Sequence, residues 1–112
     1  MNKTRCYLTE STLMFKSKGH VDGEYGKNIL CAAISAITQA LAFYLSKLDD
    51  KGAFYDFFAD RTEGGLYIKA VFNSLYENQI KGAYEMTVTG LLMLEKQYPE
   101  HIKISDESQK YL

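Results

Sequence analysis

Polar and apolar residues alternate in two short segments near the N-terminus. Residues 4–9 (TRCYLT) and residues 12–17 (TLMFKS) follow this period of two, which is typical of strands. Only Glu10 and Ser11 separate the two segments, so we expect an antiparallel hairpin here.

A longer period governs residues 29–48. Leucine or isoleucine recurs every three or four positions, which predicts a helix with one buried face. These residues are Leu30, Ile34, Ile37, Leu41, Leu45 and Leu48. Asn28 is expected to cap this helix, because its side-chain oxygen is able to accept from the N–H groups of the first turn. Asp49, Asp50 and Gly52 are expected to end it.

Two further strands are predicted after this helix, over residues 53–59 and 66–72, joined by a turn that contains two glycines. A short last strand is expected over residues 101–105, and the polar tail 106–112 is expected to fray. The resulting order, β-β-α-β-β-α-β, predicts an α+β fold with a small antiparallel sheet and two helices.

The second helix is expected to run from a cap at Asn73 or Ser74 to about Tyr98. Its apolar stripe consists of Ile80, Tyr84, Val88, Leu91 and Leu94. Gly82 and Gly90 weaken such a helix by about 1 kcal/mol each relative to alanine. We therefore expect these glycines to mark close contacts between the helix and the sheet.

Length and composition narrow the class of protein. The 112 residues, 46% of them hydrophobic, suit a single globular domain over residues 1–112. A net charge of −1 gives no broad basic field, so no direct nucleic-acid partner is expected. Two cysteines are too few for a disulfide scaffold, and the N-terminus lacks the pattern of a secretory leader. Residues 29–45 are judged too short and too polar for a membrane span, so a cytoplasmic protein without a membrane partner is expected.

The candidate chemistry lies where a glycine-rich segment meets the first helix. Residues 19–28 (GHVDGEYGKN) contain three glycines and are expected to form a loop, an element that often carries function. Cys31 follows within the expected first turn, where unpaired N–H groups and the helix macrodipole favour a thiolate. His20 lies eleven residues earlier and is a candidate base.

Helical geometry places Ser35, Thr38 and Ala42 on the same face as Cys31, beside the apolar stripe. Cys31 is thus expected where the core meets solvent, and Ser35 is positioned to donate a hydrogen bond to the sulfur or to a substrate carbonyl. A cysteine in an alanine-rich helix also fits a small buried core residue, and this alternative stays open. One histidine and one cysteine are too few ligands for zinc, so no metal and no cofactor are expected.

The string GHVDGEYGKNILCAAISAITQAL resembles the signature of Prp, the bacterial ribosomal-processing cysteine protease family. That signature has a Gly-His pair, a glycine-containing loop, an Asp, and a helix that opens with Cys-Ala and carries a Ser four residues after the Cys. The matching positions are Gly19, His20, Cys31, Ala32 and Ser35. Residues 90–104 (GLLMLEKQYPEHIKI) are similar to the last helix and strand of the family.

The resemblance implies a homodimeric α+β protease without a cofactor. Such proteins remove an N-terminal extension from a large-subunit ribosomal protein (number twenty-seven), cutting after a Phe-Phe-like motif. His20 is then the base and Cys31 the nucleophile. Some relatives are encoded by bacteriophages, for which a capsid or scaffold protein is the natural substrate.

The same resemblance assigns roles to the neighbouring residues. The loop residues expected to admit an extended peptide are Gly19, Asp22, Gly23, Tyr25 and Gly26. First-turn N–H groups near Ala32 are expected to hold the oxyanion.

One position departs from the family, since Asn28 stands where the family has Asp. A neutral amide is adequate to orient a catalytic histidine, but the charge is lost. Two alternatives therefore remain: a non-catalytic binding module of the same fold, and a structural dimerisation protein from a phage operon.

Overall fold

The computed structural model describes residues 1–19, 25–62 and 64–111, and gives only the backbone conformation of residues 25–28 and 111. The strands are β1 (Asn2–Leu8), β2 (Thr12–Lys18), β3 (Phe54–Thr62), β4 (Gly65–Phe72) and β5 (Ile102–Asp106). The helices are α1 (Tyr25–Asp50) and α2 (Glu77–Gln97), with 3₁₀ turns η1 (Ser74–Tyr76) and η2 (Ser108–Tyr111). The predicted order β-β-α-β-β-α-β is confirmed.

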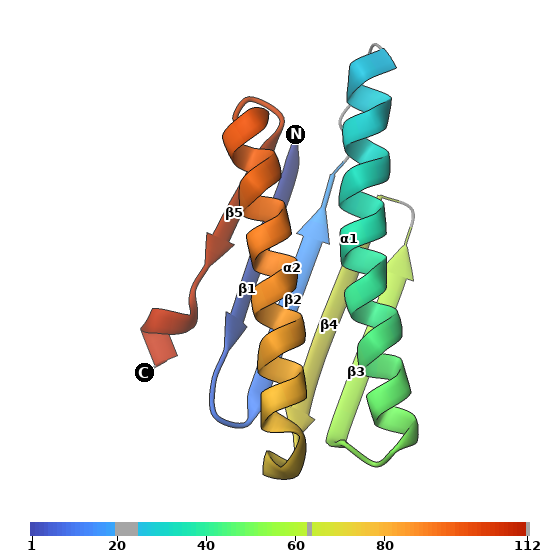
Figure 1. Cartoon of the computed structure of the whole chain (residues 1–112), viewed down its shortest axis with the longest axis vertical. Coiled ribbons are helices and arrows are strands. Elements are labelled where there is room, and N and C mark those ends of the chain that lie inside the picture. Colours follow the sequence, from blue (N-terminus) through green and yellow to red (C-terminus); the bar gives the residue numbers. More distant parts are fainter. Residues whose placement is uncertain (20–24, 63, 112) are drawn as a thin grey trace.

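All five strands belong to one sheet with the order β3-β4-β2-β1-β5 (Figure 1). The pairs β1–β2, β2–β4 and β3–β4 are antiparallel, whereas β5 pairs with β1 in parallel. The expectation of an antiparallel sheet was therefore wrong for β5. Its direction follows from α2, which carries the chain from the end of β4 back along the sheet before β5 begins.

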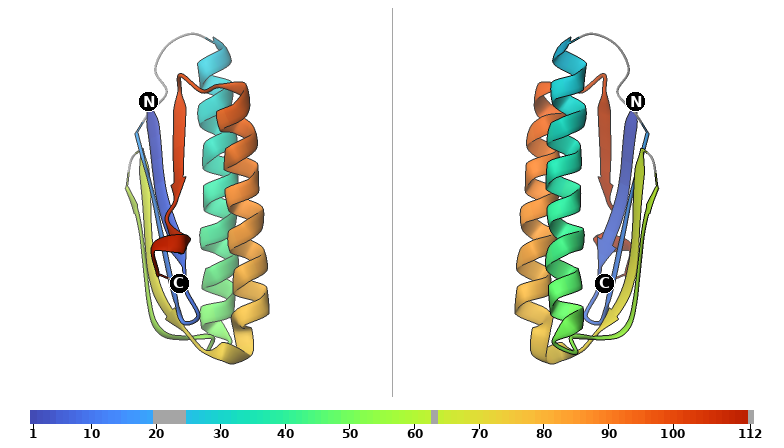
Figure 2. Two further views of the ribbon diagram at one scale, coloured as in Figure 1. Left: turned by 90° about the vertical axis from the view of Figure 1, so that its left-hand side faces the viewer. Right: turned by 90° about the vertical axis from the view of Figure 1, so that its right-hand side faces the viewer.

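Both helices pack on the same face of the sheet, so the molecule has two layers (Figure 2). The core lies between the layers and is apolar; its most deeply buried side chains include Leu13, Phe15, Leu30, Leu45, Ile68, Ile80, Leu91 and Ile102. Of the helices in the described residues, none covers the opposite face of the sheet.

The apolar character of α1 is explained by this packing. Within Ile29–Asp50, an 18-residue window has a mean hydropathy of 1.8, so this helix is long and apolar enough to cross a membrane, and the judgement that the region is too short and too polar was wrong. Leu30, Leu41, Leu45 and Leu48 of this segment are buried in the core. Such a stripe is what a core helix requires, and length with composition alone is weak evidence for a membrane span.

Helix α1 begins at Tyr25, four residues before the predicted start at Ile29. Tyr25 and Gly26, which were assigned to the substrate loop, are therefore helical. Asn28 lies inside the first turn and does not cap the helix, so this prediction was wrong.

The second helix is entered through η1. The Asn73 side-chain oxygen accepts from the Leu75 N–H at 3.0 Å, which confirms Asn73 as a cap, although of this 3₁₀ turn. A Cβ on Gly90 would lie 3.3 Å from Ile37 Cδ1 of α1, and a Cβ on Gly82 would meet nothing within 4 Å. The expected helix–sheet contacts are thus wrong: Gly90 allows the two helices to approach, and Gly82 is exposed.

The C-terminal tail is ordered rather than frayed. Glu107 is buried, its N–H donates to the Cys6 carbonyl at 2.7 Å, and its carboxylate pairs with Arg5 at 3.0 Å and with Lys110 at 2.9 Å. These contacts fasten η2 to β1.

Candidate functional site

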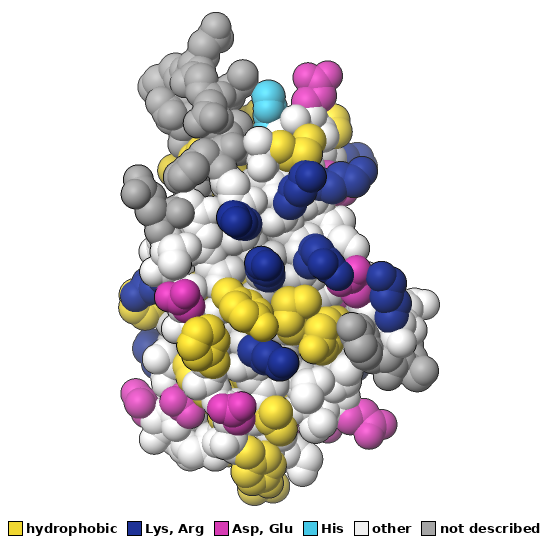
Figure 3. Space-filling model, turned by 180° about the vertical axis from the view of Figure 1, so that it is seen from behind, with side chains coloured by type: hydrophobic (Ala, Val, Ile, Leu, Met, Phe, Trp, Pro, Cys, Tyr) yellow, Lys and Arg dark blue, Asp and Glu magenta, His cyan; other side chains and the backbone are white. Residues whose placement is uncertain are grey.

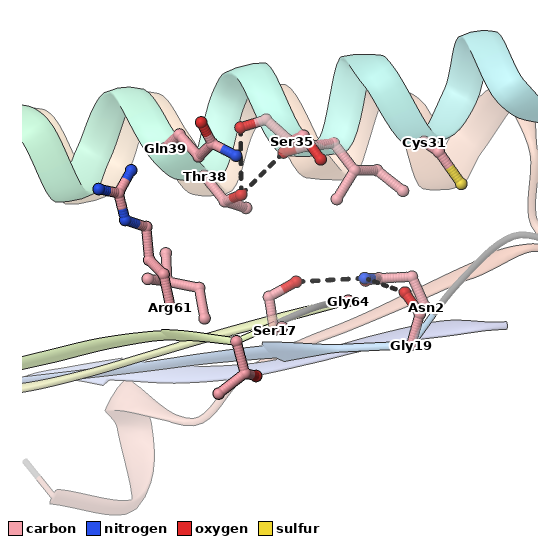
Figure 4. Close-up of a pocket in the computed structure, with 13 residues that line it drawn as sticks. Asn2, Ser17, Gly19, Cys31, Ser35, Thr38, Gln39, Arg61 and Gly64 are labelled. Atoms are coloured by element: carbon pink, nitrogen blue, oxygen red, sulfur yellow. Dashed lines mark hydrogen bonds between the residues drawn. The ribbon is translucent and has the colours of Figure 1, made fainter.

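A pocket of about 170 Å³ opens between α1 and one end of the sheet (Figure 4). Helix α1 forms one wall, and strands and the β3–β4 turn form the other. The lining residues are Asn2, Ser17, Gly19, Cys31, Ile34, Ser35, Thr38, Gln39, Arg61, Thr62, Gly64, Gly65 and Leu66.

Cys31 lies at one end of this pocket, half-buried against the core. Its sulfur points from α1 into the gap between helix and sheet (Figure 4). The predicted position at the border of core and solvent is confirmed.

The predicted reason for the reactivity of Cys31 is not confirmed. Because α1 begins at Tyr25, Cys31 is the seventh helical residue and lies beyond the first turn, to which unpaired N–H groups and the macrodipole effect are confined. The Ala32 N–H likewise belongs to the interior of the helical ladder. The proposal that it holds an oxyanion was wrong.

The helix face predicted for Cys31 does line the pocket. Ser35 follows one turn later and is exposed, and Thr38 follows with its hydroxyl buried and donating to the Ile34 carbonyl at 2.9 Å. Ala42, the last residue expected on this face, lines a second pocket of about 400 Å³ instead.

Three buried polar side chains of β1 and β2 form a network, and two of them, Asn2 and Ser17, line the pocket. Asn2 Nδ2 donates to Ser17 Oγ at 3.2 Å, and the single proton of the Thr4 hydroxyl is shared between two acceptors, Asn2 Oδ1 and Ser17 Oγ, each 3.0 Å from Thr4 Oγ1. Every described buried side-chain N or O atom has a partner. A satisfied network of this kind is rigid. This network was not predicted, although Thr4 and Ser17 occupy strand positions that point inward, where an apolar residue is usual.

Gly19, which was predicted as part of the substrate loop, forms part of the pocket wall. Its N–H donates to the Gly64 carbonyl at 2.9 Å, and its carbonyl accepts from Asn2 Nδ2 at 3.4 Å. Its φ of +109° and the nearby Met1 carbonyl, with which a Cβ would collide, require glycine.

His20, Asp22 and Gly23 lie outside the described residues, and the side chains of Tyr25 and Asn28 do too.

Arg61, which the sequence analysis did not single out, lies at the far end of the pocket from Cys31. Its guanidinium is 4.9 Å from the centre of the Phe43 ring, a cation–π distance. Arg61 also lines a second pocket of about 400 Å³, with Ala42, Phe43, Ser46, Phe57, Phe58 and Ala59. Arg61 lines both pockets, and we call the two pockets together the groove.

The chain has a second thiol and a second histidine, and neither belongs to this groove. Cys6 is fully buried, and burial raises its pKa to about 11, so this thiol is protonated at neutral pH. His101 lies in the turn between α2 and β5. Among the described residues, the groove contains Cys31 as its one strong nucleophile.

Comparison with known proteins identifies the family. The model of the cysteine protease Prp family matches residues 2–103. The chain belongs to this family. The match covers the residues that line the pocket, Cys31 among them, and the sheet as far as Lys103 in β5. No curated protein matches the chain in sequence.

Solved structures share the Prp fold seen here. SMU.848 from Streptococcus mutans has a TM-score of 0.71 at 24% identity, with 96% of this chain and 98% of that chain covered. The S. aureus essential ribosomal processing protease Prp, in complex with a covalently linked product peptide, has a TM-score of 0.69 at 20% identity; in complex with a substrate peptide it has 0.70 at 18%. Each of these two comparisons covers 96% of this chain and 100% of the other. At these identities the likeness establishes the fold.

Proposed function

We propose that this chain is a cysteine endopeptidase in which Cys31 is the nucleophile and His20 the base. The observation that carries the proposal is the position of Cys31, half-buried with its sulfur directed into a polar pocket, in a chain of the Prp family. Two further facts support it. Cys6 is buried, and His101 lies outside the pocket, whereas Gly19 of the pocket is the sequence neighbour of His20.

The proposed reaction requires one proton acceptor and one thiol. His20 takes the thiol proton of Cys31, and the thiolate attacks the scissile carbonyl carbon. The tetrahedral intermediate collapses to a thioester as the C–N bond breaks, and His20 returns the proton to the leaving amine. Water then attacks the thioester, again losing its proton to His20, and the thiol is released.

Ser35 is the proposed hydrogen-bond donor for the substrate carbonyl. Its hydroxyl lies one helical turn from Cys31 on the pocket-lining face, while the backbone N–H of Ala32 is occupied within the helix. The hydroxyl therefore replaces the first-turn N–H groups that the sequence had suggested.

The groove suits an extended peptide with bulky apolar side chains. From Cys31 to Phe43 along α1 the distance is about 18 Å, which corresponds to about five residues of extended chain. Phe43 and Phe57 offer aromatic surface in the second pocket. These features support a substrate that carries a Phe-Phe-like motif near the scissile bond.

We infer the substrate class from the family. The proposed reaction removes an N-terminal extension from a large-subunit ribosomal protein (number twenty-seven) in the cytoplasm, with a phage capsid or scaffold precursor as the second candidate. The S. aureus relative is described as a ribosomal processing protease with bound substrate peptide, which supports a protein substrate.

A homodimer is proposed as the active species. Met86 and Met93, seven residues apart on α2, are 75% and 60% exposed on the same helix face, as in a helix that meets a partner. Sedimentation equilibrium is expected to give twice the monomer mass of 12.7 kDa; a monomer at micromolar concentration would contradict the dimer.

Cleavage of a synthetic peptide tests the enzymatic proposal. The substrate is a peptide of about ten residues with Phe-Phe before the scissile bond, compared with an Ala-Ala version. The parent chain is expected to cut the first peptide, and Cys31→Ala and His20→Ala to lose at least about 1,000-fold in kcat. Cys6→Ala, the matched removal of the other thiol, is expected to stay active. Mass spectrometry of the products measures each rate.

Two results would contradict the proposal. Cleavage by Cys31→Ala at the parent rate would remove Cys31 from the reaction. Tight binding of the peptide by the parent chain with no cleavage would instead support the non-catalytic binding module.

A further inference from the structure

The face of the sheet opposite the helices carries an unusual concentration of positive charge. The chain has 13 Lys and Arg residues in all. Six of them occupy strand positions that alternate with buried, helix-facing positions, so their side chains are exposed on the open face. These six are Lys3, Arg5, Lys16, Lys18, Lys69 and Lys103. We call these six residues the basic face. Seen from behind, the blue area of this face consists of separate side chains around the yellow group in its middle, with magenta side chains beside them (Figure 3).

Several of these charges are direct cross-strand neighbours. Lys3 is paired with Lys18 of β2 on one side and with Lys103 of β5 on the other, and Arg5 is paired with Lys16. Like charges placed directly opposite each other destabilise a sheet. The fold thus gains nothing from this arrangement, which points to an anionic ligand.

The described carboxylates do little to neutralise the basic face. Arg5 pairs with Glu107 at 3.0 Å. Among the described residues, no carboxylate lies within ion-pair distance of the five lysines. Asp56 and Asp60 of β3 lie on the same open face, opposite Val71 and Tyr67 of β4, so the positive charge is concentrated on β1, β2 and β5.

Exposed aromatic rings border the lysines. Tyr67 of β4 is the cross-strand neighbour of Lys16, and Phe58 of β3 is the neighbour of Lys69. The two rings are 5.9 Å apart in an edge-to-face arrangement, and they are 36% and 52% exposed. Figure 3 shows the apolar side chains grouped immediately beside the blue area.

We propose that the basic face binds single-stranded RNA. Lysines supply contacts to phosphates, and aromatic rings on a flat sheet provide stacking surfaces for unpaired bases. A lipid surface needs the charge but not the rings, and a second copy of this chain would bring like charges together across a two-fold axis. This assignment replaces the expectation, drawn from net charge alone, that the chain has no direct nucleic-acid partner.

Fluorescence anisotropy with a labelled oligouridylate of about 12 nucleotides tests the assignment, over about 50–200 mM KCl. The variant Lys3→Gln/Lys18→Gln/Lys69→Gln is compared with Lys47→Gln/Lys81→Gln/Lys96→Gln, which removes three exposed lysines from the helices. Both variants have the same net charge. All six positions are exposed, and circular dichroism is used to verify that both variants fold.

The parent chain is expected to bind the RNA at low salt. The sheet variant is expected to weaken binding at least about tenfold and to reduce the slope of log K against log salt by about 2, while the helix variant stays within about twofold. Tyr67→Ala is expected to weaken binding about tenfold with no change of slope. Cys31→Ala is expected to bind like the parent, which separates this proposal from the peptidase activity.

Other outcomes would overturn the assignment. The absence of RNA binding by the parent at low salt would refute it, as would equal losses in the two triple variants. Tighter binding to phosphatidylserine vesicles or to polyglutamate, unaffected by Tyr67→Ala, would assign the basic face to a membrane or an acidic protein segment instead.

Discussion

Gly19 shows how one residue shapes the pocket. It joins the end of β2 to the segment that contains His20, and its backbone bonds to Gly64 and Asn2 hold it at the pocket wall. The positive φ and the contact with the Met1 backbone leave no space for a side chain. The position of the pocket wall therefore depends on glycine.

Replacing this glycine by alanine gives a direct prediction. Gly19→Ala is expected to lower the free energy of unfolding by about 1–3 kcal/mol, because the left-handed conformation and the backbone clash both oppose a Cβ. Gly82→Ala is the matched control, because Gly82 is exposed on α2 and a Cβ there would meet nothing within 4 Å. This substitution is expected to raise the free energy of unfolding by up to about 1 kcal/mol. Urea unfolding measures both; equal stability of Gly19→Ala and the parent would contradict the account.

Some residues of the pocket could be predicted from the sequence, and others could not. The pocket-lining face with Cys31, Ser35 and Thr38 could be predicted, because helical periodicity is local and needs no knowledge of the fold. Asn2 and Arg61 could not, because their place in the site depends on the order of the strands and on the packing of β3 beside α1. These are consequences of tertiary structure.

The type and the order of the helices and strands were predicted correctly. The errors concern where α1 begins and in which direction β5 runs. The glycines of residues 19–28 favoured a loop, yet α1 continues through Gly26 to Tyr25, since extending an existing helix costs far less than starting one. The parallel pairing of β5 with β1 likewise could not be read from the alternation of residues 101–105, which is the same for either direction.

The docking of η2 on β1 predicts a pH dependence of stability. Hydrogen bonding to Lys110, with the nearby Arg5 guanidinium, holds the pKa of Glu107 below its ordinary value. For Asp106, partial burial alone would raise the pKa, but hydrogen bonds from Ser108 and Tyr84 outweigh it and the pKa is lowered. A lowered folded-state pKa adds stability above the unfolded-state value, near 4, and this stability is lost as pH falls through the folded-state value.

Glu107→Gln tests this linkage. The variant is expected to be less stable than the parent at pH 7, and the difference is expected to close as pH falls below about 4. Glu10→Gln, in the exposed turn between β1 and β2, serves as the control and should show no such closing gap. Urea unfolding at a series of pH values measures both variants. A difference that persists unchanged at acidic pH would show that the carboxylate charge of Glu107 does not hold η2.

At the scale of the whole molecule, the placement of both helices on one face of the sheet creates two distinct surfaces. The pocket with Cys31 lies between α1 and the sheet, and the basic face lies on the far side of the same sheet. The proposed peptidase activity and the proposed RNA binding therefore use separate side chains. Variants of one surface are expected to leave the other intact.

Acid-quenched mass spectrometry during turnover tests the central claim most directly. The parent chain is mixed with the Phe-Phe peptide, quenched within the first turnover, digested and mapped. The account predicts a thioester of the N-terminal product fragment on Cys31, present in Cys6→Ala and absent in Cys31→Ala. Turnover with the fragment attached to Cys6, or with no covalent fragment on Cys31 at any time, would contradict it.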